Sequence, residues 1–377
     1  MMHYTYQIIS CFFLGYPINM LAIMKTETVS EKEAHSNLQS KSRNSVGPKK
    51  TFRDSLFKVS SNTIGRGTTK FLFKLYDLGR FDIFGKPQGA ISSFDITNRC
   101  NLRCKHCYFY AHDYESEKEL TDDEWINKLE ELKETDFPFY QCSWIGGEPL
   151  LRKELIERCM KYFKSNLVAT NGTIPLPDWP DVNFYIAVDG PEEMHDEIRG
   201  KGCYAKIRKN ANRPDLKIIV SMVVNKINYT GIERFLEDWV NTPVKGCLFQ
   251  MHTPVKGLEY NDELWPGWEL RDQIVDKLIA LKEEKYGDFI AVPRYVLEMM
   301  KSDTCKEVTT NCLFRQISFC LDPQGNRKRP CMMGPLADCE RCGCVLPFHL
   351  KALEDKKLMF REMLMNLKRK VGKKVFN

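Results

Sequence analysis

The sequence lacks an apolar run long enough to span a membrane. The run near its start, Ile8–Leu14, is soon interrupted by Pro17 and Asn19, whereas a spanning helix needs about 20 apolar residues. No small-residue cleavage site follows the run, so a secretion signal is not expected either. We expect a cytoplasmic protein, and we interpret residues 1–23 as an upstream extension, because an ordinary polar N-terminal stretch begins after Met24.

The sequence also has little net charge and no basic block in its middle. Its 56 Lys and Arg nearly balance 50 Asp and Glu, which leaves a formal charge of +6. Binding to nucleic acid through the phosphate backbone needs a concentrated basic surface, so we expect no nucleic-acid partner. Hydrophobic residues make up 43% of the 377 positions, enough to build one large or two moderate domains.

Cysteine, in contrast, is abundant and clustered. Ten of the 15 cysteines lie within Cys100–Cys107 and Cys305–Cys344. Their close spacing, inside a chain with an α/β pattern, favours metal ligation in a reducing compartment over disulfides. We interpret four of the scattered cysteines as small buried hydrophobic residues, namely Cys142, Cys159, Cys203 and Cys247.

The first cluster has the spacing C-x3-C-x2-C and consists of Cys100, Cys104 and Cys107. Three thiolates on so short a loop can bind three corners of an iron–sulfur cubane, which leaves one iron without a protein ligand. An open coordination position is typical of a catalytic centre. Because His106 and His112 lie close by, a structural zinc site remains the alternative.

This spacing, with Asn-Leu after the first cysteine and Tyr after the last, resembles the radical S-adenosylmethionine (SAM) superfamily. The resemblance implies a [4Fe-4S] cluster on Cys100, Cys104 and Cys107, whose open iron binds SAM. It further implies reductive cleavage of SAM to a 5′-deoxyadenosyl radical. The electron would come from a reductant such as ferredoxin or flavodoxin.

From residue 90 onward, strand-like and helical patterns alternate. Six β/α units predict an α/β fold with parallel strands and helices outside them. This agrees with the partial (β/α)6 TIM-like barrel that the resemblance implies, where site residues gather at the carboxyl ends of strands. The predicted strands are Ile91–Thr97, Tyr140–Ile145, Asn166–Thr170, Phe184–Val188, Lys217–Val224 and Cys247–His252. The predicted helices are one after the capping box Thr121–Glu124, then Leu150–Ser165, Tyr204–Asn212, Tyr229–Val240 and Trp268–Glu284.

Candidate cofactor contacts follow the predicted strands. Gly146-Gly147-Glu148-Pro149 ends the second strand and resembles the GGEP motif of the family, which holds the amino group of SAM. Asn171 and Asp189 end the third and fourth strands and are candidates for the ribose or the backbone, although both residue types also occur in plain turns.

Further contacts are implied by the stretch Val188–Gly200, which resembles family members that carry extra clusters. Arg199 is the candidate for the SAM carboxylate, because guanidinium binds carboxylate with two parallel hydrogen bonds. His106 takes the place of an aromatic residue near adenine, and Ser221 is a candidate ribose contact. We assign His195 a structural role.

The second cysteine cluster surrounds a predicted hairpin turn at Leu321–Gly325. The order Cys312, Gly325, Cys331 is similar to the Twitch half of a SPASM extension, with one residue more between the glycine and the cysteine. The similarity implies one auxiliary [4Fe-4S] cluster. Its ligands would be Cys312, Cys331, Cys339 and Cys342, and Cys344 or Cys320 could replace one of them. Four cysteines could also hold structural zinc.

We therefore divide the chain into five segments. Polar composition predicts a disordered N-terminal segment, and two basic amphipathic segments could pack on the barrel or contact a membrane peripherally. The segments are 1–50, disordered; 51–87, basic and amphipathic; 88–286, the barrel; 287–348, the cysteine-rich extension; and 349–377, a basic amphipathic C-terminal helix.

The substrate remains open at this point. The basic ends, and a layout loosely similar to the hopanoid adenosyl-transfer enzyme, favour a lipid substrate. Family members with auxiliary clusters often modify peptides, so a peptide or protein substrate is the alternative. A different class of protein, a non-catalytic iron–sulfur redox or sensor protein, is the third interpretation.

Overall fold

The computed structural model describes residues 89, 91–111, 118–256 and 262–354. Eight strands form one sheet with the order β6-β5-β4-β3-β2-β1-β7-β8. All neighbouring pairs are parallel except β7 and β8. The strands are β1 Ile91–Asp95, β2 Gln141–Ile145, β3 Ser165–Thr170, β4 Asn183–Ala187, β5 Lys217–Val224, β6 Cys247–Met251, β7 Ser318–Leu321 and β8 Arg327–Lys328.

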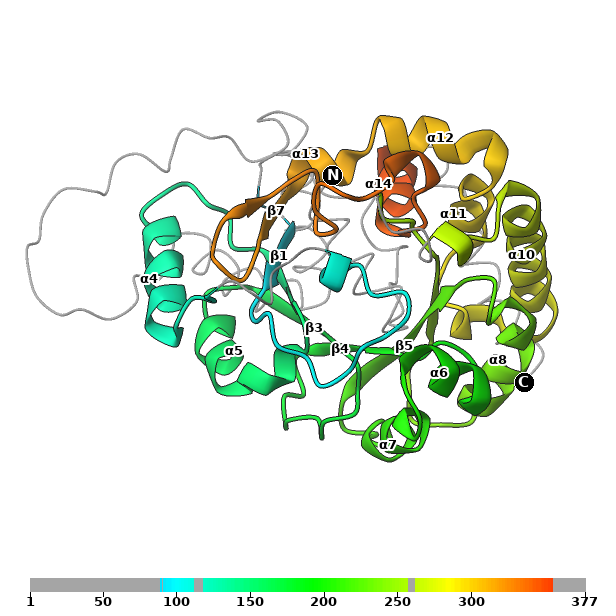
Figure 1. The fold of residues 1–377 in the computed structure, drawn as a ribbon, viewed down its shortest axis with the longest axis horizontal. Coiled ribbons are helices and arrows are strands. Elements are labelled where there is room, and N and C mark those ends of the chain that lie inside the picture. The colour runs from blue at the N-terminus through cyan, green and yellow to red at the C-terminus, as the bar shows by residue number, and fades with distance from the viewer. Residues whose placement is uncertain (1–88, 90, 112–117, 257–261, 355–377) are drawn as a thin grey trace, which may run out of the picture.

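Helices cover the outer side of the curved sheet (Figure 1). This arrangement confirms the predicted α/β fold with a partial barrel. The helices are α4 Asp122–Lys133, α5 Lys153–Met160, α6 Glu192–Arg199, α7 Cys203–Asn210, α8 Ile232–Val240, α10 Trp268–Leu281, α11 Arg294–Met299, α12 Ser302–Thr310, α13 Leu313–Ile317 and α14 Leu346–Glu354.

Strand β1 shows how the sequence separates the two faces of the sheet. Its residues are all buried, and alternate side chains point to opposite faces. Phe94 packs outward against Trp125 of α4, with 5.7 Å between the ring centroids, whereas Ile91 lines the interior cavity. The capping box predicted at Thr121 and Glu124 is present and begins α4. Strand β1 therefore joins the outer core to the inner site.

The structure differs from the six-strand prediction by one additional parallel strand. Strand β7 pairs with β1 from Ile91↔Ser318 to Phe94↔Leu321, so the sheet continues past the predicted boundary at residue 286. The hairpin predicted after β7 is present, and Asp322 accepts hydrogen bonds from the backbone of Gln324 and Asn326 within its turn. The two strands of this hairpin were predicted, but the parallel pairing of β7 with β1 was not, because β7 has four residues and follows three short helices instead of one β/α crossover.

Two helix predictions need correction. The helix predicted over Leu150–Ser165 is a 3-10 turn, Pro149–Arg152, followed by α5, which ends at Met160. Helix α6 was not predicted as a helix. Its sequence is mostly charged, so its helical periodicity, which places His195 and Ile198 on one buried face, is carried by few apolar residues.

The predictions for segments 1–50 and 51–87 and for the tail after residue 354 lie outside the described residues, although α14 overlaps the start of the C-terminal helix that was predicted. No helix in the described part of the chain is both long and apolar enough to cross a bilayer.

Candidate active site

The three cysteines of the first cluster lie on one loop after β1, at the mouth of a cavity of about 370 Å³ that all three line. Each thiol is partly exposed. Burial raises the pKa of Cys104 to about 11, and Arg199 opposes this rise. Among the described residues, no three His, Cys, Asp or Glu side chains are placed to hold a single metal ion. The loop thus presents three thiols to the cavity.

The chain that leads into this loop is fixed by two residues that we did not predict. Glu119 accepts hydrogen bonds from the hydroxyl of Thr97, at 2.7 Å, and from the backbone N–H of Asn98, at 2.9 Å. Arg152 donates to the carbonyl of Ile96 at 2.9 Å. Neither Glu119 nor Arg152 belongs to a motif, so only their tertiary contacts identify them.

The GGEP segment packs directly on the same loop. Gly147 N–H donates to the Thr97 carbonyl at 2.9 Å, and Glu148 N–H donates to the Arg99 carbonyl at 2.8 Å. A Cβ on Gly147 would lie 2.1 Å from the Arg99 carbonyl oxygen, and one on Gly146 would lie 2.5 Å from the Thr97 oxygen. The glycines are therefore required for the end of β2 to approach the cysteine loop, in addition to any ligand contact.

The carboxylate of Glu148 joins the ends of β2 and β3. It is fully buried and accepts hydrogen bonds from Leu150 N–H at 3.0 Å, the Thr170 hydroxyl at 2.8 Å and Asn171 N–H at 2.8 Å. Burial raises its pKa, which these hydrogen bonds oppose. Pro149 follows as the first residue of the 3-10 turn, a position that suits proline. Glu148 is thus a structural acceptor in the described site.

Asn171 lies beside the first cysteine. Its amide Nδ2 donates to Asn101 Oδ1 at 2.8 Å and lies 3.8 Å from the Sγ of Cys100. Its Oδ1 accepts from the N–H and the hydroxyl of Thr173. The side chain that we predicted to contact ribose is therefore already bonded within the chain, next to the loop.

Asp189, Arg199 and His106 form a buried ionic group at the cavity. Arg199 Nε donates to Asp189 Oδ2 at 2.5 Å, and His106 Nε2 lies 3.0 Å from the same oxygen. Burial works against ionisation of Asp189, but Arg199 and His106 hold the pKa of its carboxyl well below its usual range. Arg199 Nη1 also lies 3.8 Å from Cys104 Sγ. One carboxylate therefore orients the two side chains that we predicted to contact SAM.

His195 and Asn228 form hydrogen bonds with the backbone of Asp189. His195 Nδ1 accepts from the backbone N–H of Asp189 at 3.0 Å, and Asn228 Nδ2 donates to its carbonyl at 3.1 Å. Burial lowers the pKa of His195 to about 4, so the ring is neutral at pH 7 and its Nδ1 can accept. These contacts give His195 a structural task.

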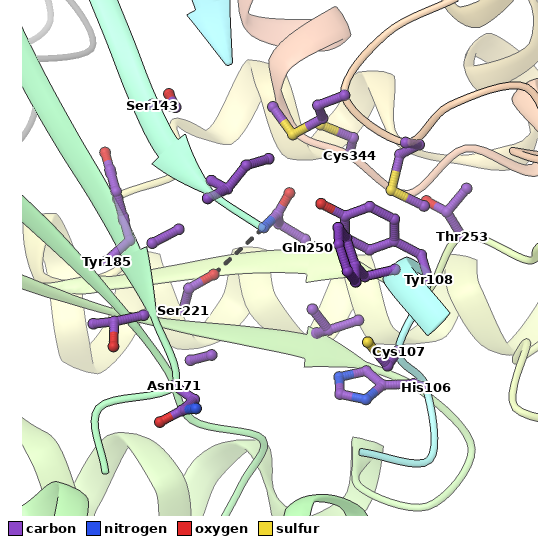
Figure 2. Close-up of a pocket in the computed structure, with 18 of the residues that line it drawn as sticks. His106, Cys107, Tyr108, Ser143, Asn171, Tyr185, Ser221, Gln250, Thr253 and Cys344 are labelled. Atoms are coloured by element: carbon purple, nitrogen blue, oxygen red, sulfur yellow. Dashed lines mark hydrogen bonds between the residues drawn. The ribbon is translucent and has the colours of Figure 1, made fainter. Parts of the chain in front are cut away.

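The cavity continues into the barrel, where neutral polar side chains line it (Figure 2). Gln250 Nε2 donates to the Oγ of Ser221 at 3.4 Å, and Tyr185 of β4 and Ser143 of β2 also line the cavity. We predicted Ser221 but missed the others. A signal existed, because Gln250 and Tyr185 are polar residues at the inward positions of buried strands.

The second cysteine cluster borders the same cavity through Cys344. Burial raises the pKa of Cys331, and Cys344 and Cys339 raise it further; Cys342 is affected in the same way by Cys331 and Cys312. Cys320 acts on Cys331 in the same way, so the four predicted ligands, Cys344 and Cys320 lie in one part of the fold.

The remaining predictions on cysteine concern Cys320 and the four scattered cysteines. Cys320 is fully buried in β7, opposite Lys328 of β8. The four cysteines predicted to be buried hydrophobic residues are buried, which confirms that prediction.

Comparison with known proteins identifies the region that carries the first cluster. The model of the Radical SAM superfamily matches residues 94–239. The chain is 31% identical over 163 residues to the Fe-coproporphyrin III synthase of Methanosarcina barkeri, a match that covers 40% of each protein. It is 32% identical over 151 residues to the serine-type anaerobic sulfatase-maturating enzyme of Bacteroides thetaiotaomicron, covering 34% of each.

A third relative is the mycofactocin maturase of Mycolicibacterium smegmatis, 26% identical over 207 residues, which cover 50% of this chain and 51% of that protein. The matches therefore span between one third and one half of these relatives.

Two solved structures share the fold. Native anSMEcpe with bound AdoMet has a TM-score of 0.51 at 17% identity, covering 68% of this chain and 80% of that one. Streptococcus suis SuiB bound to the precursor peptide SuiA has a TM-score of 0.52 at 12% identity, covering 81% and 78%. At such low identity, the likeness shows the fold alone.

Proposed function

We propose that this chain, whose residues 94–239 form a radical SAM domain, is an enzyme that cleaves SAM reductively and modifies a substrate by radical chemistry. One observation carries the proposal. The thiols of Cys100, Cys104 and Cys107 line one cavity together with Arg199 and His106. When bound, a [4Fe-4S] cluster on these thiols would supply the electron that cleaves SAM.

The residues around the loop suit this cofactor pair. Arg199 is oriented by Asp189 and would bind the SAM carboxylate, while the backbone of Gly146 and Gly147 would meet its amino group. His106 would lie against the adenine, since its Nδ1 is buried without a hydrogen-bond partner among the described residues. Ser221 would contact the ribose. The protein's own part is to bind and orient SAM and to exclude water from the cavity.

We propose a peptide or protein as the substrate. Two relatives are maturases, and one of them is named for the maturation of a sulfatase, which is itself a protein. The cavity supports this choice, because neutral polar groups such as Gln250, Ser221 and Tyr185 suit a side chain or a backbone amide. The lipid interpretation depended on the basic ends of the chain, which lie outside the described residues.

We further propose that Cys312, Cys331, Cys339 and Cys342 hold an auxiliary [4Fe-4S] cluster beside the substrate. The support is that these thiols influence one another electrostatically and that Cys344, two residues after Cys342, lines the cavity. Thiolates are the usual ligands of such clusters. A ferredoxin or flavodoxin would serve as the reductant.

The test is anaerobic reconstitution with iron and sulfide, followed by reduction with SAM present and chromatography for 5′-deoxyadenosine. We expect its formation, and we expect a peptide fraction of cell extract to raise the rate and to gain a mass change. No 5′-deoxyadenosine under any condition would instead favour a redox or sensor protein. Stimulation by the lipid fraction alone would restore the lipid interpretation.

A further inference from the structure

Arg271 of α10 is a completely buried cation that the mechanism above does not use. Its side chain is 0% exposed. Its guanidinium donates three hydrogen bonds: Nε to the Met300 carbonyl at 2.8 Å, Nη1 to the Cys342 carbonyl at 3.0 Å and Nη2 to Cys305 Sγ at 3.3 Å. The side chain thus joins α10 to the end of α11, to α12 and to the second cysteine cluster.

These partners are two carbonyls and a thiol, and neither a carbonyl nor a neutral thiol carries a full negative charge. No carboxylate of the described residues forms an ion pair with Arg271. The adjacent Asp272 acts on it electrostatically, but its oxygens accept hydrogen bonds from the N–H and hydroxyl of Ser302 on the surface. A buried charge without a counter-ion costs several kcal/mol or more. A further anion near Arg271 would therefore stabilise its buried charge.

Lys328 provides a contrast within the same protein. Its ammonium is also buried, and it forms an ion pair with the buried carboxylate of Asp95. Burial next to a carboxylate is the usual arrangement for a cation. Arg271 has two carbonyls and one thiol where Lys328 has a carboxylate.

We propose that Arg271 is the counter-charge of an anionic auxiliary cluster and fixes the ligand Cys342 in place, an inference that rests on the cluster proposed above. Four thiolates around a [4Fe-4S] core with charge +2 carry a net charge of −2. The cysteine group that would carry this charge includes Cys342, whose carbonyl Arg271 binds directly. The charge that Arg271 requires and the charge that the cluster brings are therefore complementary.

The contacts also give Arg271 a positioning role. The Cys342 carbonyl accepts from Arg271 and faces the Cys305 thiol at 3.7 Å, so it is held from two sides. Trp268 lies beside the guanidinium, with 5.3 Å from its carbon to the ring centroid. A fixed positive charge near a cluster favours its reduced, more negative state and thus raises its reduction potential.

The test is a redox titration of the reconstituted protein, followed by electron paramagnetic resonance with SAM added to distinguish the first cluster. We compare wild type, Arg271→Met, Arg271→Lys and Arg208→Met. Arg208 is a matched control, because it also donates to a carbonyl, that of Asp238, and lies over a tryptophan, Trp239, without contacting the second cysteine cluster.

At the wild-type midpoint, we expect Arg271→Met to lower the ratio of reduced to oxidised auxiliary cluster about tenfold, or about 59 mV for one electron. Arg271→Lys, which keeps the charge, should stay nearer to wild type, and Arg208→Met should match it. An unchanged midpoint in Arg271→Met would overturn the proposal and leave only a hydrogen-bonding role.

Two further outcomes are decisive. The first applies if Arg271→Met does not retain auxiliary iron. In that case, an auxiliary cluster that Arg271→Lys retains near the wild-type potential supports the proposal. Loss of the auxiliary cluster from Arg271→Lys as well overturns the proposal. Wild-type protein without auxiliary iron also overturns it. In that case the 5′-deoxyadenosine assay on the same preparation still judges the proposed function independently.

Discussion

The two cysteine clusters border one cavity, but the chain supports them with different chemistry. At the first, Arg199 is paired with the carboxylate of Asp189 and reaches toward Cys104. At the second, Arg271 has no carboxylate among the described residues and binds the carbonyl of Cys342. A cation that is already paired with a carboxylate is stable whether or not a further ligand is bound. A buried cation without such a partner is stabilised only while an anion stays beside it. The comparison suggests an exchangeable cofactor at the first site and a permanent one at the second.

The strongest way to separate the two sites is to remove one thiol from the first. We expect Cys104→Ala to abolish 5′-deoxyadenosine formation and to remove about four irons per chain, because two thiolates hold an open cubane poorly. Iron analysis and chromatography measure both effects, and the second cluster should remain. Cys203→Ala, which changes a buried thiol outside both clusters, is the control. SAM cleavage by Cys104→Ala would show that this loop is not catalytic.

The support of the first loop can be broken without touching a thiol. In Gly147→Ala the new methyl would meet the Arg99 carbonyl at 2.1 Å, so the loop must move. Since a displacement near 1 Å can cost about 100-fold in rate, we expect SAM cleavage to fall by about that factor.

Gly202→Ala is the control for this prediction. Unlike Gly147, Gly202 has a positive φ, of 78°, and its Cβ would meet nothing within 4 Å. Equal losses of SAM cleavage in the two variants would mean that substitution of a glycine in general, and not the contact with the loop, causes the effect.

Changing the second site should leave the first working. We expect the double variant Cys339→Ala, Cys342→Ala to lose the iron of one cluster while uncoupled formation of 5′-deoxyadenosine stays near the wild-type rate, because the residues proposed to bind SAM lie elsewhere. Metal analysis of anaerobically purified protein gives the count. Zinc without additional iron in the wild type would replace the auxiliary cluster by a structural site.

The smallest effect concerns acid stability of the first site. His195 has a pKa of about 4 in the fold and about 6.5 when unfolded. Between these values the unfolded chain binds the additional proton, so the free energy of unfolding declines as pH falls through this window. From pH 7 to pH 5 we expect a loss of about 2 kcal/mol.

Anaerobic denaturant unfolding at the two pH values measures this loss. His195→Gln keeps a neutral hydrogen-bond acceptor and should therefore show a smaller dependence on pH. If the free energy of unfolding of this variant depends on pH as strongly as that of wild type, another group causes the acid sensitivity.

Much of the site could be predicted from short stretches of sequence. Cys100, Cys104 and Cys107 lie within eight consecutive residues, so they must lie close together in the fold, and Gly147 closely follows a strand that the alternating pattern predicts. The SAM contact of Gly147 was predicted, but its close approach to the cysteine loop was not, because its neighbour Arg99 belongs to another segment. Glu119 was missed altogether, since its role as a hydrogen-bond acceptor depends on where Thr97 and Asn98 lie in space.

The sequence alone determined the order of strands and helices and the residues that share a loop, because hydrophobic periodicity and short spacings act over a few residues. Only the tertiary structure decided that β7 closes on β1 and that Asp189 holds both Arg199 and His106. It also decided that Arg271 meets Cys342, 71 positions later. Such contacts depend on how whole elements pack, and no local pattern encodes which distant side chain will neutralise a buried charge.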